Sequence, residues 1–462
     1  MLLSSNSKSK FIVLIVYLFT AFIITSCKKY IDKKPDSTLA IPTALSDLQA
    51  LLDLSLTMNK EQSPSFGEAS CDDYFLSDEM YNSKPIEHQM IYTWSRGDYY
   101  FQNDWSKAYL PIYVSNYCLE QIDKIPETFQ NQLNWNNVKG SALFFRSYNF
   151  LNLMWVYAKA YDSSKAGIEP GIVLRYSSDF NLPSKRSNIQ ECYDQIISDA
   201  KESLEYLPDM PIHVMRPSKT ASYGLLARCY LSMRAYDSAL KYSNLCLELK
   251  SDLIDYNGDD DIYGSVTANT PFKQFNKETI FYTEMNGNSY INYPSGVLVD
   301  TILYSQYDST DLRKTAFFRP DGNYYRFKGN YAASNFIYFS GLTTGEMLLT
   351  RSECFARKGN IASAIKDLNT LLRKRRNRNL PFHELEAHNF IETLHLVLSE
   401  RRKELYMRGL RWMDIKRLNK EGANIILKRT IEGKLYYLEP NASYYALPLP
   451  TDIIDITGMT QN

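Results

Sequence analysis

Residues 399–418 read SERRKELYMRGLRWMDIKRL, and this stretch decides the fold. Arginine is frequent in it, yet Trp412 and Ile415 require a buried surface, so charged and apolar side chains share a short segment. Gly409 can adopt the left-handed conformation that closes a helix. The apolar spacing therefore predicts one helix that stops near Gly409 and a second, short amphipathic helix over residues 410–418.

The order of residues in this stretch resembles the ERR-x-EL … G-x-RW-x-D-x-R signature of the SusD/RagB family of outer-membrane nutrient-binding lipoproteins. The matching residues are Glu400, Arg401, Arg402, Glu404, Leu405, Gly409, Arg411, Trp412, Asp414 and Arg417. Arginine and glutamate brace helices through ion pairs, so we interpret the signature as scaffold that identifies the family without marking the ligand site. The resemblance implies a mainly α fold, an α-α superhelix of tetratricopeptide-like hairpins with a long, partly β, aromatic-rich insertion.

Helical periodicity extends over most of the chain. It predicts helices over residues 42–56, 104–125, 136–161 and 189–207, and helical hairpins over residues 218–249 and 344–375. The two hairpins share small residues at equal offsets, with Ala227 twelve positions before Ala239 and Ser352 twelve before Ala364. Small residues at these points allow paired helices to approach closely, which is the packing of tetratricopeptide repeats.

Two segments lack this periodicity. Residues 62–102 and 251–342 are rich in Tyr, Asp, Pro and Gly, with short strand-like runs at 278–285 and 324–327. Long irregular segments inside a compact domain tend to be functional. Residues 445–450 resemble the terminal apolar-proline strand of the family.

The N-terminus has the pattern of a lipoprotein signal. Basic residues precede an apolar run over residues 11–24, which is too short for a comfortable membrane span, and Cys27 follows small residues. By resemblance to bacterial lipoproteins, residues 1–26 form a signal peptide, Cys27 carries the lipid, residues 27–40 form a tether and residues 41–462 form a single domain. Lys28 stands where exterior-facing lipoproteins of this group usually have acidic residues.

Composition excludes some functions and favours others. The formal net charge is zero, so the chain has no global electrostatic reason to bind nucleic acid. Aromatic residues make up 14% of the chain, including 36 Tyr, which indicates either a thick aromatic core or a surface that stacks on a ligand.

No cofactor or metal site is expected. Apart from Cys27, the cysteines are interpreted as free, buried thiols, because no C-x-x-C pair exists. His388, Glu392 and His395 share one face of a predicted helix, and we interpret them as a solvated surface. The acidic residues at 255–261 lack the glycine and glutamate of a calcium loop and are interpreted as a turn.

A helical scaffold with two aromatic-rich segments favours a binding protein over an enzyme. Sugar rings offer apolar faces to aromatic side chains, while their hydroxyl groups need polar partners such as Asp. The candidate ligand contacts are Asp73, Tyr74, Tyr81, Trp94, Tyr99 and Tyr100 from the first segment, and Tyr290, Tyr293 and Tyr324 from the second. Of these, Trp94 is the strongest individual candidate.

The family resemblance implies glycan capture at the exterior face of the outer membrane and delivery to a SusC-like TonB-dependent transporter. Three alternatives remain. The same kind of lipoprotein could bind peptides, the helical hairpins could bind proteins, or the chain could be a glycosidase with two carboxylates placed across a sugar. No motif singles out such a pair of carboxylates.

Overall fold

The described part of the chain is built mainly from helices. The computed structural model describes residues 42, 44–100, 103–289, 297–381 and 383–462. The chain divides into two units, residues 1–43 and 44–462, and every element named below belongs to the second. Among the described residues, no helix combines the length and the apolar character that a membrane span requires.

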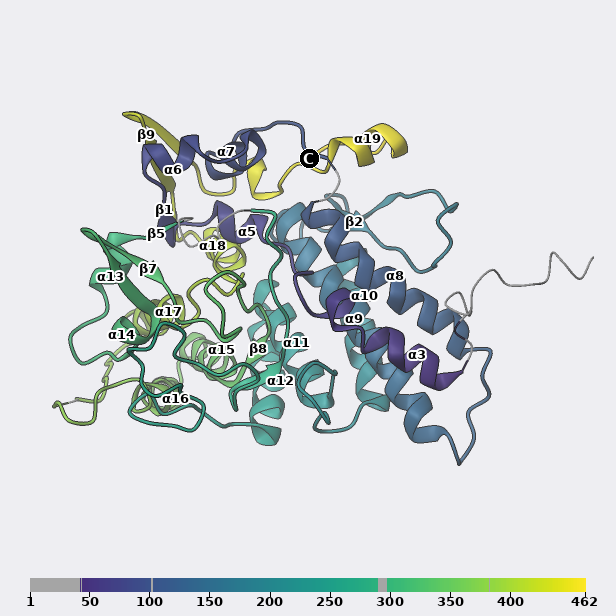
Figure 1. Ribbon diagram of the computed structural model, residues 1–462, viewed down its shortest axis with the longest axis horizontal. Helices are drawn as coiled ribbons and strands as arrows, with labels where there is room; N and C mark the ends of the chain where they lie inside the picture. The colour runs from purple at the N-terminus through teal and green to yellow at the C-terminus, as the bar shows by residue number, and fades with distance from the viewer. Residues whose placement is uncertain (1–41, 43, 101–102, 290–296, 382) are drawn as a thin grey trace, which may run out of the picture. The chain divides into compact units, whose positions relative to one another are not determined.

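The scaffold is a series of helices in which neighbours along the chain pack against one another (Figure 1). Helix α12 packs against α15 although an insertion separates them in sequence. The scaffold helices are α3 (Leu45–Leu52), α8 (Asp104–Ile122), α9 (Gln132–Tyr157), α10 (Ile189–Tyr206), α11 (Lys219–Ser232), α12 (Tyr236–Leu249), α15 (Thr344–Arg357), α16 (Ile361–Leu372), α17 (Phe390–Glu404) and α18 (Arg411–Asn419). The mainly α fold is confirmed, although the first predicted helix is divided into α3 and α4 (Ser55–Met58).

The two predicted hairpins are α11 with α12 and α15 with α16. In the second hairpin, the Ser352 hydroxyl donates a 2.8 Å hydrogen bond to the Ala364 carbonyl, so the small residues meet where the helices cross. In the first, the rings of Tyr230 and Tyr242 stack with 5.6 Å between their centroids. Small side chains thus meet between the helices of the second hairpin, and stacked aromatic rings lie between those of the first.

The two aperiodic segments contain more regular structure than predicted. The first holds α5 (Phe66–Ser70), β1 (Tyr74–Phe75), α6 (Asp78–Asn82) and α7 (Ile86–Tyr92). Helices this short leave too few turns for periodicity to be detected. The second holds β4 (Thr279–Phe281), β5 (Leu298–Val299), α13 (Thr301–Ser305), α14 (Arg313–Phe317), β6 (Phe318–Asp321), β7 (Tyr324–Phe327) and β8 (Leu342–Thr343). The run at 324–327 is confirmed as β7, whereas only the centre of 278–285 is a strand.

The remaining elements are short strands and turns. They are β2 (Pro170–Val173), β3 (Arg186–Asn188), β9 (Leu427–Ile431), β10 (Lys434–Leu438), the 3₁₀ turn η1 (Ser443–Tyr445) and α19 (Thr451–Thr457). Each sheet is an antiparallel pair among the described residues: β1 with β5, β2 with β3, β4 with β8, β6 with β7, and β9 with β10. The strand expected at 445–450 is wrong, because η1 and the prolines replace it, although these residues are buried.

The signature stretch forms the predicted pair of helices, α17 and α18. Gly409, between them, has a positive φ of 76°. Arg417 pairs with Glu353 at 2.6 Å, and Arg313 pairs with Glu400 at 2.6 Å, with every one of these side chains at most 6% exposed. Buried pairs of this kind are costly to break one partner at a time. This network agrees with the interpretation of the signature as scaffold.

The core is rich in aromatic rings and thiols. Phe281 packs against Phe144, Phe145 and Tyr148 with ring centroids 4.7–5.7 Å apart. The described cysteines are all free and buried, as predicted. Many of the tyrosine side chains are also buried, so much of the tyrosine content belongs to the core.

Candidate ligand-binding surface

The two aperiodic segments meet in space. Strand β1 pairs antiparallel with β5, with Tyr74 opposite Val299, and the Asp300 amide donates a 3.0 Å hydrogen bond to the Asp73 carbonyl. Strand β5 in turn contacts β7. Residues far apart in the sequence are thus joined by backbone hydrogen bonds, whose geometry fixes the side chains of both segments relative to one another.

An exposed aromatic pair lies at this meeting point. The rings of Phe75 in β1 and Tyr324 in β7 meet edge to face with 5.2 Å between centroids. Tyr324 is 43% exposed and Phe75 is half-buried, so both rings leave part of their surface open to solvent. An exposed ring held by a second ring is a rigid stacking surface.

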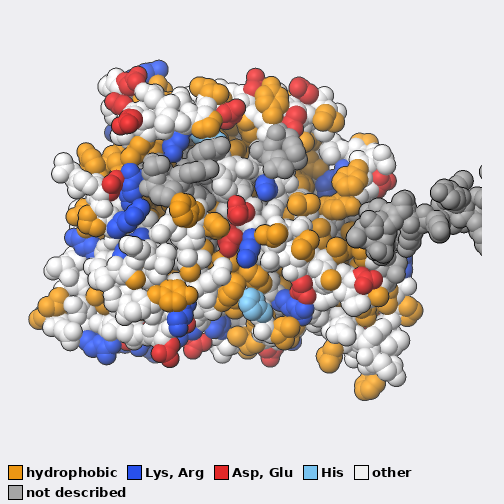
Figure 2. All heavy atoms as spheres, viewed as in Figure 1, with side chains coloured by type: hydrophobic (Ala, Val, Ile, Leu, Met, Phe, Trp, Pro, Cys, Tyr) orange, Lys and Arg blue, Asp and Glu red, His pale blue; other side chains and the backbone are white. Residues whose placement is uncertain are grey.

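Basic side chains lie in the same region of the molecule as the aromatic pair. Figure 2 shows Lys and Arg side chains gathered on the left of the molecule, over the region of β5 and β7 in Figure 1. Arg326 donates a 2.7 Å hydrogen bond to the Asp321 carboxylate and a 3.3 Å hydrogen bond to the Val297 carbonyl. We call the surface formed by Phe75, Tyr324 and Arg326 the junction surface.

Four of the predicted ligand contacts lie inside the protein. Asp73, Tyr74, Trp94 and Tyr99 are each at most 8% exposed. Their polar atoms already have partners: the Trp94 indole N–H donates a 2.9 Å hydrogen bond to the Ser70 carbonyl, and the hydroxyl groups of Tyr74 and Tyr99 donate to backbone carbonyls. In the described structure these four side chains therefore lie in the interior, where they hold the first segment in place, and they do not form an open stacking surface.

The other predicted contacts lie at the surface or outside the described residues. Tyr100 is 56% exposed, and Tyr81 is half-buried with its ring 5.9 Å from that of Tyr92. With Tyr324, they are the predicted aromatic residues that a ligand can reach in the described structure. Tyr290 and Tyr293 lie outside the described residues.

Three arginines that no sequence argument linked to this region support the buried residues. Arg402 donates a 2.9 Å hydrogen bond to the Asp73 carboxylate, and Arg411 binds the Asp72 carboxylate with two donors at 2.7 and 2.9 Å. The Arg429 guanidinium lies 5.3 Å from the Trp94 ring centroid. Arg402 and Arg411 belong to the signature, which is the feature of the sequence that could have pointed to them. Arg429 stands in a strand that carries no motif.

The carboxylates in this region are either held by arginines or protonated. Burial tends to raise the pKa of Asp72, but the guanidinium groups of Arg411 and Arg402 hold that pKa below its ordinary value. Glu68 accepts a 2.8 Å hydrogen bond from the Gly409 amide, and burial, followed by the nearby Asp73 carboxylate, raises its pKa to about 8. Glu68 is therefore largely protonated near neutral pH.

Potential metal ligands are few among the described residues. Glu68, Cys71 and Asp73 offer atoms within 4.8 Å of one another, but Arg402 already binds Asp73 and the Cys71 thiol donates to Glu68. In the acidic turn at 255–261, the Lys277 ammonium and backbone amides bind Asp259 and Asp261. Both clusters have protein partners for their charges.

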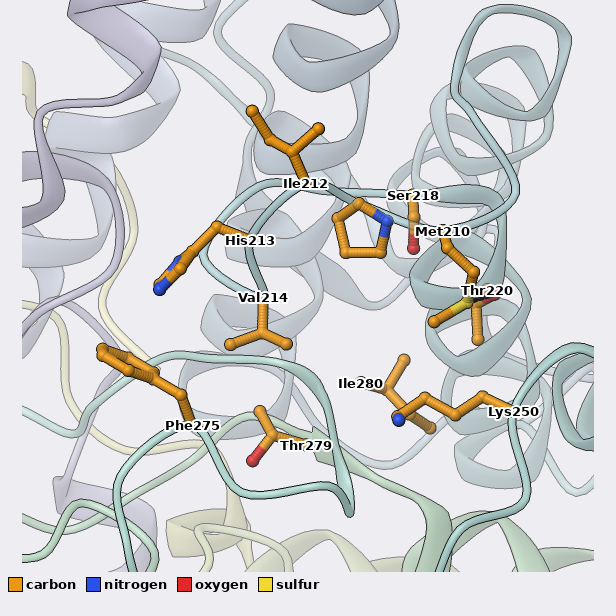
Figure 3. Close-up of a pocket in the computed structure, with 11 residues that line it drawn as sticks. Met210, Ile212, His213, Val214, Ser218, Thr220, Lys250, Phe275, Thr279 and Ile280 are labelled. Carbon is orange, nitrogen blue, oxygen red and sulfur yellow. Dashed lines mark hydrogen bonds between the residues drawn. The ribbon is translucent and has the colours of Figure 1, made fainter.

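Several cavities lie elsewhere in the protein. The cavity in Figure 3 has a volume of about 260 Å³, with His213 and Phe275 at one end and Met210, Thr220 and Lys250 at the other. The rings of His213 and Phe275 meet edge to face at 4.7 Å. Larger cavities of about 560 and 710 Å³ adjoin α8 and α3 respectively. The described candidate residues line none of these three cavities.

Two family models match the chain. One, described as starch-binding and associating with the outer membrane, matches residues 29–231, and the SusD family model matches residues 300–455. A curated relative, SusD-like protein P2 of Formosa agariphila, is 22% identical over 405 residues, which span 75% of this chain and 76% of that protein.

Solved structures share the fold. A putative sugar binding protein from Bacteroides vulgatus has a TM-score of 0.74 and 22% identity, covering 91% of this chain and 98% of that chain. A SusD superfamily protein from Bacteroides thetaiotaomicron has a TM-score of 0.71 and 18% identity, covering 91% and 99%. A helical-hairpin scaffold that carries an inserted, loop-built surface defines the class of this protein. Within that class, the chain belongs to the SusD/RagB family.

Proposed function

We propose that this protein is an outer-membrane lipoprotein that binds oligosaccharides or polysaccharides without cleaving them. The observation that carries the proposal is the exposed pair of Phe75 and Tyr324, which the pairing of β1 with β5 places beside charged side chains. A sugar ring can stack on such a pair while its hydroxyl groups bind the neighbouring polar groups. The sugar-binding description of a structural relative and the starch-binding description of the family support the same ligand class.

Binding without catalysis agrees with how the carboxylates near the pair are used. Hydrolysis needs two carboxylates on opposite sides of a sugar. Asp73 is buried against Arg402, and Asp321 pairs with Arg326. Each of these carboxylates balances an arginine.

We assign ligand contact to Tyr81, Tyr100 and Tyr324, and retain Tyr290 and Tyr293 as proposed contacts. Asp73, Tyr74, Trp94 and Tyr99 then position the first segment. Cys27 carries the lipid that holds the protein at the outer membrane, facing the exterior. A SusC-like TonB-dependent transporter is the proposed receiver of the bound glycan.

Affinity electrophoresis of the full-length protein in detergent tests this function. The gels contain neutral polysaccharides, acidic polysaccharides or a peptide mixture. We expect retardation by a polysaccharide, and we expect Tyr324→Ala to weaken it about tenfold, the effect of losing one stacking contact. Phe390→Ala is the matched control, because Phe390 is 44% exposed and lies on α17. Retardation by peptides alone would move the assignment to peptide capture, and retardation by neither would refute it.

A further inference from the structure

We propose that the cavity of about 710 Å³ beside α3 is a second saccharide site, which takes an uncharged oligosaccharide. We call this cavity the scaffold groove. It is formed by α3, the first two turns of α9, the end of α10 and residues 207–216. The inference rests on the proposed function, because it extends the same class of ligand to a second place on the molecule.

Side-chain amides from two helices line the scaffold groove. Gln49 belongs to α3, and Asn134, Asn136 and Asn137 belong to the start of α9. An amide side chain offers two N–H donors and a carbonyl acceptor, and a sugar hydroxyl both donates and accepts. Four amides in one cavity therefore match the hydroxyl groups of a saccharide.

A chain of hydrogen bonds fixes the orientation of these amides. The Asn137 amide donates a 2.6 Å hydrogen bond to the Gln49 side-chain oxygen, and the Gln49 amide donates a 2.9 Å hydrogen bond to the Asp53 carboxylate. The Nε of Arg216 donates a 2.7 Å hydrogen bond to the same carboxylate. The polar groups are thus ordered before a ligand arrives, which lowers the cost of binding.

This chain leaves hydrogen-bonding capacity for a ligand. Asn137 uses one of its N–H groups in it, and its carbonyl oxygen accepts no hydrogen bond within the described part of the chain. The side chains of Asn134 and Asn136 form no hydrogen bond with any described residue, and Asn136 is half-buried. The unused donors and acceptors belong to residues that line the groove.

The charge of the lining decides between neutral and acidic sugars. The charged side chains among the lining residues are Asp53 and Arg216, and they form an ion pair with each other. The lining therefore carries no net charge. An acidic sugar would gain nothing from it, whereas an uncharged sugar can use the amides directly.

Apolar surface accompanies the amides. The half-buried ring of Tyr206 meets the Trp135 ring edge to face, with 5.9 Å between their centroids. Leu133 and Ile212, which also line the groove, are 85% and 82% exposed. Ring and aliphatic surfaces can cover the C–H face of a sugar. The volume also lies within the roughly 300–1,000 Å³ that is typical of small-molecule sites.

A second site changes how the protein holds a polymer. Figure 1 shows α3, α9 and α10 on the right of the molecule, and β5 and β7 on the left. A ligand in the scaffold groove therefore does not compete for the junction surface. A polysaccharide long enough to reach both would be held at two points, which strengthens its attachment without any new contact at either site.

Isothermal titration calorimetry of the full-length protein in detergent tests the inference. The uncharged probes are maltohexaose, mannohexaose and laminarihexaose. Asn136→Ala and Gln49→Ala are the groove variants, and Tyr324→Ala reports on the junction surface. Gln132→Ala is the matched control, because Gln132 is an exposed amide residue of α9 that is not among the lining residues. Thermal unfolding of each variant shows that it has folded.

We expect a hexasaccharide binding event that Tyr324→Ala leaves unchanged. Each groove variant should weaken this event about fivefold, the effect of losing one hydrogen bond to the ligand, and the control should not alter it. If Tyr324→Ala weakens all hexasaccharide binding and neither groove variant alters it, the inference is overturned while the proposed function stands. Binding of no hexasaccharide also overturns the inference, and absence of retardation by every polysaccharide overturns the proposed function with it.

Discussion

The Nε of Arg402 donates a 2.9 Å hydrogen bond to the carboxylate of Asp73, 329 residues earlier in the chain. The Asp73 side chain is 1% exposed and that of Arg402 is 18% exposed, so this pair links the signature helix to the first segment inside the protein. The signature therefore anchors the first segment, in addition to its part in the scaffold.

Arg402→Met should therefore destabilise the protein. Removing the guanidinium leaves the Asp73 carboxylate buried with only the more distant Arg411, 3.8 Å away, to balance it. We expect a loss of about 3 kcal/mol in the free energy of unfolding, measured by urea denaturation. Adding Asp73→Asn should restore part of this loss, because the unbalanced charge is then gone. A loss in Arg402→Met below about 1 kcal/mol would show that the pair does little for stability.

Trp94→Ala should reduce stability, and any loss of glycan binding should follow from that. The side chain is 8% exposed, and a buried Trp replaced by Ala costs about 3–5 kcal/mol. Trp94→Phe keeps most of the ring and loses the hydrogen bond to Ser70, a change of about 1 kcal/mol. Thermal unfolding and affinity electrophoresis of both variants separate the two effects. Unchanged unfolding in Trp94→Ala, together with lost binding, would return Trp94 to direct ligand contact.

Glu68 gives a dependence of stability on pH with a defined sign. Its pKa is raised from 4.5 to about 8 in the folded protein. Its contribution to stability is therefore fully present below pH 4.5 and is lost as the pH rises through about 8. Glu68→Gln removes this dependence, so the stability of the variant relative to the parent should rise across this window, by on the order of 5 kcal/mol at the alkaline end. Urea denaturation at several pH values measures the difference, and parallel curves for the two proteins would contradict it.

Cys27→Ala should release the protein from the outer membrane. Without the thiol there is no atom to acylate, and the chain should appear in the soluble periplasmic fraction. Cell fractionation followed by detection of the protein checks this. Cys354→Ala is the matched control, because Cys354 is a free, buried thiol and its loss should leave the membrane association intact. Membrane association of the Cys27 variant would refute the lipid anchor.

The sequence predicted those parts of the fold that repeat over many residues. Helices such as α10 and the hairpin of α15 and α16 contain enough turns for apolar spacing to locate them. Helices α5, α6 and α7 do not, and the first segment was therefore predicted to be irregular. Gly409 located the break between α17 and α18 because a positive φ there restricts the residue type.

The candidate site was only partly predictable, for a physical reason. A tyrosine has an apolar ring and a hydroxyl group, so Tyr74 in the core and Tyr324 at the surface have the same local pattern. Which of them is buried depends on long-range pairs such as β1 with β5, and no local pattern contains that information.

The order of synthesis determines when the contacts between distant segments can form. The residues of β1 and Asp73 leave the ribosome long before Arg402 and Arg411, whereas the helical hairpins are complete soon after they are made. The ion pairs of Asp72 and Asp73 can thus form only after Arg402 and Arg411, in the last part of the chain, have been synthesised. A chain that stalls or is cut before residue 400 could keep folded hairpins and still have no finished surface to offer a glycan. The contacts of Arg402 and Arg411 thus form last, after most of the scaffold has been synthesised.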